Sequence, residues 1–143
     1  MKVHTILKQK GRGVVTVQGG HTMEDASKLL AKHRIGAVVV TDTAGRVVGV
    51  LSERDVVRAL AEHGGPALAR PVREFMTQEV VTCGGDETVD QLMELMTERR
   101  IRHLPVLDGG ELVGIVSIGD VVKMKIAATE FEAEALKQYI AAG

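Results

Sequence analysis

The chain has 143 residues, enough for a sizeable hydrophobic core, and a formal net charge of −1 at pH 7. That charge gives no general basic surface for nucleic acid, and two Phe, one Tyr and no Trp offer few rings on which bases could stack. The single cysteine gives no disulfide framework and no cysteine-based metal site. No segment is typical of a signal peptide and no apolar run has membrane-spanning length, so we expect a cytoplasmic protein without a membrane or nucleic-acid partner.

The first half of the chain predicts a short helical segment, a helix, a hairpin of two strands and a second helix. The expected elements are the helical segment Val3–Leu7 and a turn at Lys10–Gly13, a helix capped by Thr22 over Met23–His33, the strands Ala37–Val40 and Val47–Leu51 around the turn Asp42–Gly45, and a helix that begins with Val56–Leu60. Thr22 is a good N-cap because its hydroxyl can accept a hydrogen bond from the first helical turn. Short β-branched runs favour the strands, and Gly64 followed by Pro66 ends the second helix.

The second half predicts the same order, followed by a tail. The expected elements are a helical turn at Val72–Met76, a strand at Val80–Cys83, a helix capped by Thr88 over Val89–Thr97, the strands Leu104–Leu107 and Leu112–Val116 around the turn Asp108–Gly110, a helix at Val121–Ile126 and a tail helix at Ala127–Ile140. The apolar residues of the main helix recur with helical spacing in both halves. The tail carries an apolar stripe that includes Phe131 and Tyr139. The predicted helices of the second half already cover its own core. We therefore expect this stripe to contact the other half or a second subunit.

The two halves are a sequence repeat. Identical residues align at an offset of 66 over residues 16–42, and at an offset of 65 over residues 48–57, after one residue is lost in a turn. A duplicated unit of this size cannot bury its apolar face alone, so the copies are expected to pack against each other. We therefore predict a first repeat at residues 1–66, a second repeat at 67–126, a helical tail at 127–143, and a functional cleft between the repeats.

Each repeat carries the motif Gly-x-x-Ser-x-x-Asp where a strand ends and a helix begins. Ser52 and Asp55 hold the polar positions in the first copy, and Ser117 and Asp120 hold them in the second. One interpretation is structural, because a serine N-cap and an acid at the third helical position form a capping box. The other is functional, because a hydroxyl and the N–H groups of a helix start can hold a phosphate while the carboxylate accepts hydrogen bonds from ribose. Both interpretations can hold together.

A second signal is the pair Arg102 and His103, near the start of the strand that contains Pro105. The pair is either a solvated strand entrance or, where the strand end faces the cleft, a guanidinium and an imidazole that bind phosphate. The matching residues of the first copy, Gly36 and Ala37, are uncharged. Pro105 is typical of an edge strand or of a strand's first position.

Together these residues resemble a tandem pair of cystathionine-β-synthase-type (CBS) domains, the regulatory units also called Bateman modules. The resemblance rests on the two Gly-x-x-Ser-x-x-Asp stretches and on residues 72–77 and 101–108, and the tail is similar to that of small bacterial stand-alone CBS-pair proteins. It implies an α+β fold in which two pseudo-twofold related βαββα repeats pack sheet to sheet with their helices outside. It also implies adenosine-containing ligands in two clefts.

The resemblance implies a set of binding residues for each cleft. In one cleft Ser117 and Asp120 are expected to contact phosphate and ribose, Arg102 and His103 to contact phosphate, and Thr16, Val17 and Ala37 of the other copy to flank the base. In the mirror cleft the expected residues are Ser52 and Asp55 with Thr82, Cys83 and Ile101 of the second copy, and Gly36 and Pro105 complete the set. The copies differ inside the motif, since Arg54 adds a cation where Gly119 adds space.

No complete catalytic set is present, so we expect no enzyme activity and no catalytic cofactor. The five histidines share no ligand spacing, and no metal site is predicted. Two hypotheses remain. The chain is a sensor that binds AMP, ADP, ATP or NAD(H) and signals energy or redox state to an unidentified protein partner, or it is a structural dimerisation module with vestigial clefts. The duplicated serine and aspartate favour the sensor, and a homodimer is expected in both cases.

Overall fold

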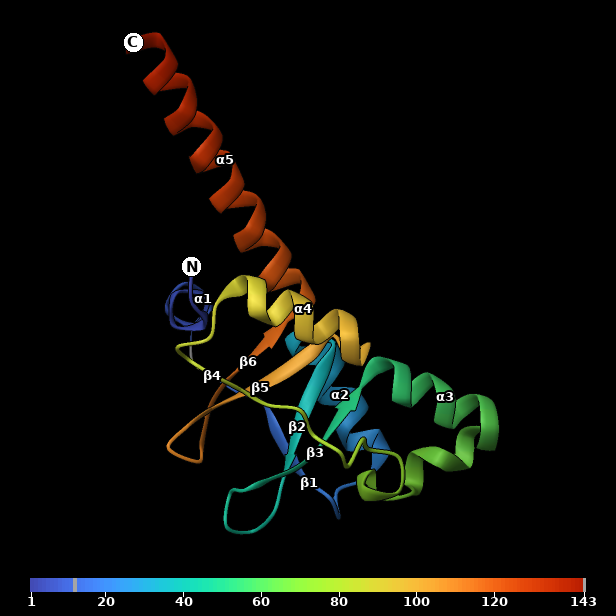
Figure 1. The fold of residues 1–143 in the computed structure, drawn as a ribbon. Helices are drawn as coiled ribbons and strands as arrows, with labels where there is room; N and C mark the ends of the chain where they lie inside the picture. Colours follow the sequence, from blue (N-terminus) through green and yellow to red (C-terminus); the bar gives the residue numbers. More distant parts are fainter. Residues whose placement is uncertain (12, 143) are drawn as a thin grey trace. The chain divides into compact units, whose positions relative to one another are not determined.

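The computed structural model describes residues 1–11 and 13–142, which form helices and two three-stranded sheets (Figure 1). The predicted mixed α+β class is confirmed. The chain divides into two compact units: unit 1 contains Met1–Arg12, Thr82–Asp108 and Gly114–Gly143, and unit 2 contains Gly13–Val81 and Gly109–Val113. The packing of one repeat on the other stays a prediction, and so do the boundaries 1–66, 67–126 and 127–143.

Unit 2 is built on the first sheet, in which the strand order is β1-β2-β3. Its elements are β1 (Thr16–Gln18), α2 (Met23–His33), β2 (Ala37–Thr41), β3 (Val47–Ser52), α3 (Glu53–His63) and the 3₁₀ segments η1 (Gly65–Ala69) and η2 (Val72–Glu74). β1 and β2 run parallel, with α2 as the crossover between them, and β2 and β3 form an antiparallel hairpin. This is the predicted βαββα order.

The second sheet repeats this plan in the order β4-β5-β6. The associated elements are α1 (Val3–Lys10), β4 (Cys83–Gly84), α4 (Val89–Arg99), β5 (His103–Asp108), β6 (Glu111–Ser117) and α5 (Ile118–Ala142). β4 and β5 run parallel, as β1 and β2 do. α5 is one continuous helix of 25 residues, drawn in orange to red in Figure 1, so the predicted closing helix and tail helix join without a break.

Local sequence explains where the first helix of each repeat begins and ends. Thr22 Oγ1 accepts a hydrogen bond from Asp25 N–H at the start of α2, and Thr88 makes the matching contact at the start of α4. Both predicted N-caps are therefore confirmed. α2 and α4 end at Arg34 and Arg100, which both have a φ of 53°, a left-handed conformation that glycine adopts more often. The two repeats are therefore alike also in the backbone conformation that ends this helix.

The core of each repeat is aliphatic, as the scarcity of aromatic residues predicts. β2 is buried over its whole length. The buried residues of α2 and α4 share the spacing i, i+3, i+7 and are Met23, Ala26 and Leu30 in the first repeat and Val89, Leu92 and Met96 in the second. Their matching positions show that the same helix face is buried in both repeats.

One predicted strand is much shorter than expected. Val80–Cys83 was expected to be extended and paired, but β4 contains only Cys83–Gly84 and pairs with Val106 and Leu107. The cause is Pro105, which has no N–H to donate. Pairing with β4 therefore begins only after the proline.

The first repeat is a control for this effect. Val39, which occupies the position of Pro105, donates its N–H to the Val15 carbonyl at 3.3 Å and so extends the pairing around β1. Pro105 itself is the third residue of β5, the middle strand of its sheet, so the prediction of an edge strand or a first position is wrong. A proline is tolerated there because the neighbouring strand is so short.

The helical segments ahead of the two sheets are counterparts, as predicted. Val3 N–H donates to the Glu87 carbonyl at 2.9 Å in unit 1, and Val72 N–H donates to the His21 carbonyl at 2.8 Å in unit 2. Glu87 and His21 occupy matching positions of the repeats, so each repeat binds the segment that precedes the other one. α1 is longer than predicted and includes Lys10, which the sequence placed in a turn.

Several helix faces leave apolar side chains exposed. Val57 of α3 is 66% exposed, and Phe131 and Tyr139 of α5 are 76% and 78% exposed. Phe131 and Tyr139 belong to the apolar stripe of the tail, which the sequence predicts to be a contact surface. No helix in the described ranges is long and apolar enough to cross a membrane.

Candidate ligand-binding site

The start of α3 in unit 2 is closed by a capping box between Ser52 and Asp55. Asp55 Oδ2 accepts hydrogen bonds from the Ser52 N–H at 2.9 Å and from the Ser52 hydroxyl at 3.1 Å. Asp55 N–H donates to Ser52 Oγ at 3.2 Å. The structural interpretation of the motif is therefore confirmed for this copy. The side chain of Asp55 is only 11% exposed, and these bonds hold its carboxylate in one orientation.

The start of α5 in unit 1 has the same hydrogen bonds. Asp120 Oδ2 accepts from the N–H and the hydroxyl of Ser117, both at 2.9 Å, and Asp120 N–H donates to Ser117 Oγ at 3.2 Å. The motif is thus duplicated in geometry as well as in sequence. In each copy the serine occupies Oδ2 of the aspartate, and the second carboxylate oxygen takes none of these bonds.

A strand entrance contacts each helix start. Glu53 N–H, the first of α3, donates to the Gly36 carbonyl at 2.9 Å, and Ile118 N–H, the first of α5, donates to the Arg102 carbonyl at 2.8 Å. The structure therefore brings the two predicted signals of each repeat together, the serine–aspartate motif and the residues at the strand entrance.

These contacts leave one backbone donor at each helix start. The first N–H of the helix reaches the strand entrance and the third reaches the serine hydroxyl. The second N–H belongs to Arg54 in α3 and to Gly119 in α5, and within residues 1–11 and 13–142 it has no hydrogen-bond partner. A free N–H at a helix N-terminus, where the helix dipole is positive, favours a bound anion.

Lys10, in the last turn of α1, is a residue that the sequence analysis missed. Its ammonium group donates to Asp120 Oδ2 at 2.7 Å and to the Ile115 carbonyl at 3.0 Å. Burial raises the pKa of Asp120, but the contacts with Lys10 and Ser117 outweigh burial and hold this pKa below its ordinary value of 3.8. No local pattern predicts a contact across 110 residues of sequence.

Asp55 has a weaker cationic neighbour than Asp120. Arg58 Nη1 lies 3.9 Å from Asp55 Oδ1, and the Arg58 side chain is 63% exposed. An exposed pair at this distance contributes little to stability. The first copy has a second cation at its helix start, because Arg54 is exposed at the position of Gly119.

Some of the predicted site residues have side chains that a ligand could not reach. Val17 is 3% exposed, and Ala37 and Cys83 are each 4% exposed, so their side chains offer almost no surface to a ligand. Burial, and to a smaller extent the charge of Glu87, raises the pKa of Cys83 to about 12. The other predicted residues outside the two motifs that keep exposed surface are Thr16, Gly36, Thr82, Ile101, Arg102 and His103. Their assignment to one cleft or the other stays a prediction.

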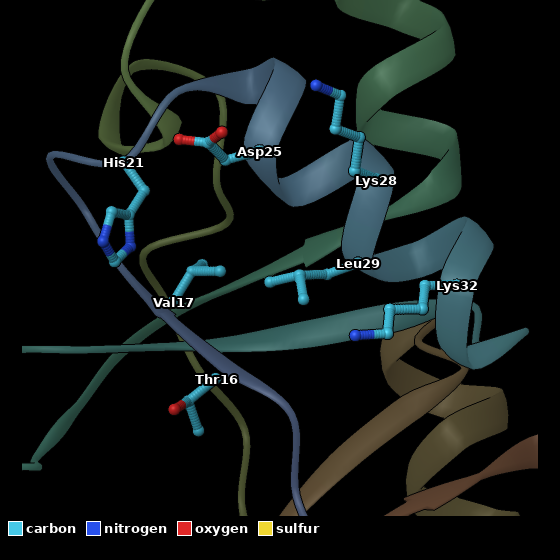
Figure 2. A pocket seen from close by; sticks show the side chains of 7 residues that line it. All are labelled: Thr16, Val17, His21, Asp25, Lys28, Leu29 and Lys32. Carbon is cyan, nitrogen blue, oxygen red and sulfur yellow. The ribbon is translucent and has the colours of Figure 1, made fainter.

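A surface pocket of unit 2 lies between β1 and α2. It has a volume of about 310 Å³ and is lined by Thr16, Val17, His21, Asp25, Lys28, Leu29 and Lys32 (Figure 2). Val17 and Leu29 point toward one another in Figure 2, and Leu29, which is partly exposed, supplies apolar surface. The residues of the α3 start do not line this pocket. His21 and Asp25 form no metal site there, since the described part of the chain holds no group of three or more His, Cys, Asp or Glu placed to bind a metal ion.

Comparisons with known proteins identify one family. The family model of the CBS domain matches residues 11–62 and 72–126. The structure is similar to the crystal structure of a CBS-domain containing protein of Agrobacterium tumefaciens, with a TM-score of 0.84 and 49% identity over 87% of this chain and 92% of that chain.

Two similar solved structures contain adenosine compounds. The CBS domain pair of protein MJ0100, in complex with 5′-methylthioadenosine and S-adenosyl-L-methionine, has a TM-score of 0.80 and 29% identity over 90% of this chain and 98% of that chain. A CBS domain protein of Pyrobaculum aerophilum complexed with AMP has a TM-score of 0.75 and 32% identity over 84% of this chain and 89% of that chain. Because the matched segments are the two repeats that the sequence shows, the chain belongs to the CBS domain family and carries a tandem pair of these domains.

Proposed function

We propose that this chain is a regulatory module that binds adenine nucleotides at the starts of α3 and α5. The observation that carries the proposal is duplicated: each helix start combines an oriented carboxylate, a serine hydroxyl and a backbone N–H that has no partner among the described residues. A capping box also leaves an N–H free at the helix start, so the support comes from the combination of this donor with an anchored carboxylate in both repeats. The similarity to CBS-domain structures that contain AMP or S-adenosyl-L-methionine supports an adenosine compound as the ligand.

We propose a role for each group of the motif. Asp55 and Asp120 would accept hydrogen bonds from ribose hydroxyls through Oδ1, because Oδ2 is already occupied by the serine. In the proposal the second N–H of each helix holds a phosphate. The serine hydroxyl donates its one proton to the aspartate in this structure and would turn to the phosphate when a ligand binds. In the proposal Arg102 and His103 add phosphate contacts at the second motif.

The base would be read mostly by backbone groups. Thr16, Val17 and Ala37 are proposed to flank the base of the ligand at Ser117 and Asp120, and Thr82, Cys83 and Ile101 that of the ligand at Ser52 and Asp55. The ligand class is AMP, ADP, ATP or NAD(H), and occupancy would be signalled to an unidentified protein partner. The module needs no catalytic cofactor.

Thermal unfolding with titration calorimetry tests the proposal. A ligand that binds only the folded chain stabilises it by about 2.7 kcal/mol at a hundredfold excess over its dissociation constant. AMP, ATP or NAD should therefore raise the melting temperature, and guanine nucleotides should raise it less. Native mass spectrometry of the purified protein would show whether a nucleotide is retained. The absence of both heat and a thermal shift with all three adenine ligands would reject nucleotide binding.

A structural dimerisation module is the second candidate function. The exposed apolar side chains of α3 and α5, among them Val57, Phe131 and Tyr139, favour it because exposed apolar surface usually marks an interface. The two candidates differ in what the aspartates do. A dimerisation module needs Asp55 and Asp120 only as helix caps, whereas a sensor loses ligand when either aspartate is removed.

A further inference from the structure

Equivalent carbonyl groups of the two repeats accept hydrogen bonds from different kinds of donor. In unit 2, Val50 and Thr77 form a backbone bridge, in which the Thr77 N–H donates to the Val50 carbonyl at 2.9 Å. The matching carbonyl of the second repeat belongs to Ile115, and there the ammonium of Lys10 is the donor, at 3.0 Å. The second repeat thus has a side-chain cation where the first repeat has main chain.

The same ammonium contacts the carboxylate of the second motif. Lys10 Nζ lies 2.7 Å from Asp120 Oδ2, and the Lys10 side chain is 36% exposed. An ammonium has three N–H donors, and the contacts with Asp120 and Ile115 use two of them. The third remains available to a ligand at the start of α5. The hydrogen bonds that Asp120 accepts from Ser117 and Lys10 are all on Oδ2, so Lys10 does not occupy the oxygen proposed to face ribose.

The charge pattern inside the motifs agrees with such a role. The first motif carries Arg54 at the second helical position, whereas the second motif carries Gly119 there and no cation of its own at that position. Lys10 therefore supplies from α1 the positive charge that Arg54 supplies from α3. Next to Asp120 it also offsets the negative charge that would repel an incoming phosphate.

From this geometry we infer that Lys10 is a specificity-determining residue of the Asp120 site, where it contacts the ligand's phosphate and selects phosphorylated adenosine compounds over neutral ones. The inference rests on the proposed nucleotide binding at this helix start. Phosphate is the relevant chemical difference, because the similar CBS-domain structures contain both AMP, which has a phosphate, and 5′-methylthioadenosine, which has none.

The test uses titration calorimetry with AMP and with adenosine on the full chain. Asp55→Ala is introduced throughout, so that only the Asp120 site is measured. Lys10→Met removes the charge and keeps the length of the side chain, and Lys10→Arg keeps the charge. Lys8→Met is the matched control, because Lys8 is an exposed lysine of the same helix. Thermal unfolding checks that each variant folds, and Lys10→Gln, which can still donate to a carbonyl, is the second uncharged variant.

We expect Lys10→Met to weaken AMP binding about tenfold, the size of one charge-assisted hydrogen bond, and to leave adenosine binding unchanged. Lys10→Arg and Lys8→Met should keep the affinity for AMP. An equal loss of affinity for both ligands would overturn the inference, because Lys10 would then only position Asp120. Unchanged or tighter AMP binding would overturn it as well. If neither the unmodified chain nor its Asp55→Ala variant binds AMP, the proposed function itself fails, and that result is distinct from a loss of selectivity.

Discussion

Leu7 lies so close to the α-carbon of Gly114 that a β-carbon on this glycine would come within 2.5 Å of Leu7 Cδ2. The first repeat has the same arrangement, because a β-carbon on Gly49 would lie 2.5 Å from Met76 Sδ. In both repeats the glycine of the Gly-x-x-Ser-x-x-Asp motif is therefore the point where the helical segment that precedes the other repeat packs on the sheet. The first residue of the motif is required by packing, and its last residues shape the helix start.

Gly49→Ala and Gly114→Ala should each destabilise the chain by about 1–3 kcal/mol, the usual cost of overpacking. The control is Gly65→Ala, since a β-carbon on Gly65 meets nothing within 4 Å. Urea unfolding monitored by circular dichroism measures the difference. Equal stability of the Gly114→Ala and Gly65→Ala variants would contradict the packing argument.

Asp55→Ala and Asp120→Ala should each remove one of two adenine-nucleotide sites. Loss of a carboxylate that accepts from ribose is expected to weaken that site by about 2–3 kcal/mol, since hydrogen bonds to charged groups are the stronger ones. Titration calorimetry should then report half the stoichiometry of the unmodified chain. Glu53→Ala is the matched control, because Glu53 is an exposed acid in the same helical turn as Asp55. Full binding by both aspartate variants would show that the aspartates are helix caps only.

Features that depend on neighbouring residues could be predicted from the sequence. Thr22 and Thr88 cap their helices as expected, because capping involves residues only a few positions apart. The hairpin turns could be placed for the same reason, and Gly109 and Gly110 adopt the positive φ values, 58° and 85°, that a tight turn needs. Because the caps and turns occur in both repeats, each copy supported the prediction made for the other, and the βαββα order could be predicted.

Features that depend on distant residues could not be predicted in the same way. Lys10 and Asp120 lie 110 residues apart in the sequence, and no periodicity or motif indicates that they are in contact. The burial of Cys83, which was expected at a cleft, follows from tertiary packing. The short β4 is an intermediate case. Comparison of Pro105 with Val39 in the other repeat would have predicted it, because only Val39 has an N–H to donate.

Cys83 should be almost unreactive toward thiol reagents in the folded chain. Its pKa is raised from 9.0 to about 12, so the reactive thiolate is about a thousandfold scarcer, and its side chain is buried. Labelling with an aromatic disulfide reagent at mildly alkaline pH should be slow in buffer and fast in concentrated urea. Similar rates in both conditions would contradict the burial of this thiol.

The carboxylate of Asp120 should stabilise the fold at neutral pH and cease to do so in acid. Its folded-state pKa lies below 3.8, so the stabilisation is present above the unfolded-state pKa and is lost as the pH falls through the lower, folded value. Asp120→Asn should therefore cost about 1 kcal/mol near neutral pH, and the difference from the unmodified chain should shrink as the pH falls below 3.8. Urea unfolding at several pH values measures it.

Glu79→Gln is the control for that titration, because Glu79 is an exposed acid in the linker. Its stability should follow that of the unmodified chain at every pH. A difference for Asp120→Asn that stays constant from neutral pH to acid would contradict the sign of the predicted dependence, since a neutral Asp120 would then stabilise the fold as well as the ionised one.

The exposed apolar residues of α5 are candidates for a contact between two copies of the chain. Phe131, Leu136, Tyr139 and Ile140 are between 59% and 78% exposed on one continuous helix, an arrangement that would favour association with a second copy. We expect a homodimer at micromolar concentration, which deletion of residues 131–143 weakens. Light scattering measures the mass of the intact and the shortened chain, and Gln138→Ala is the control for a polar residue of the same helix. A monomeric intact chain would reject the dimer. An unchanged dimer after the deletion would reject only the contribution of the tail and would leave the exposed Val57 of α3 as the contact surface to test next.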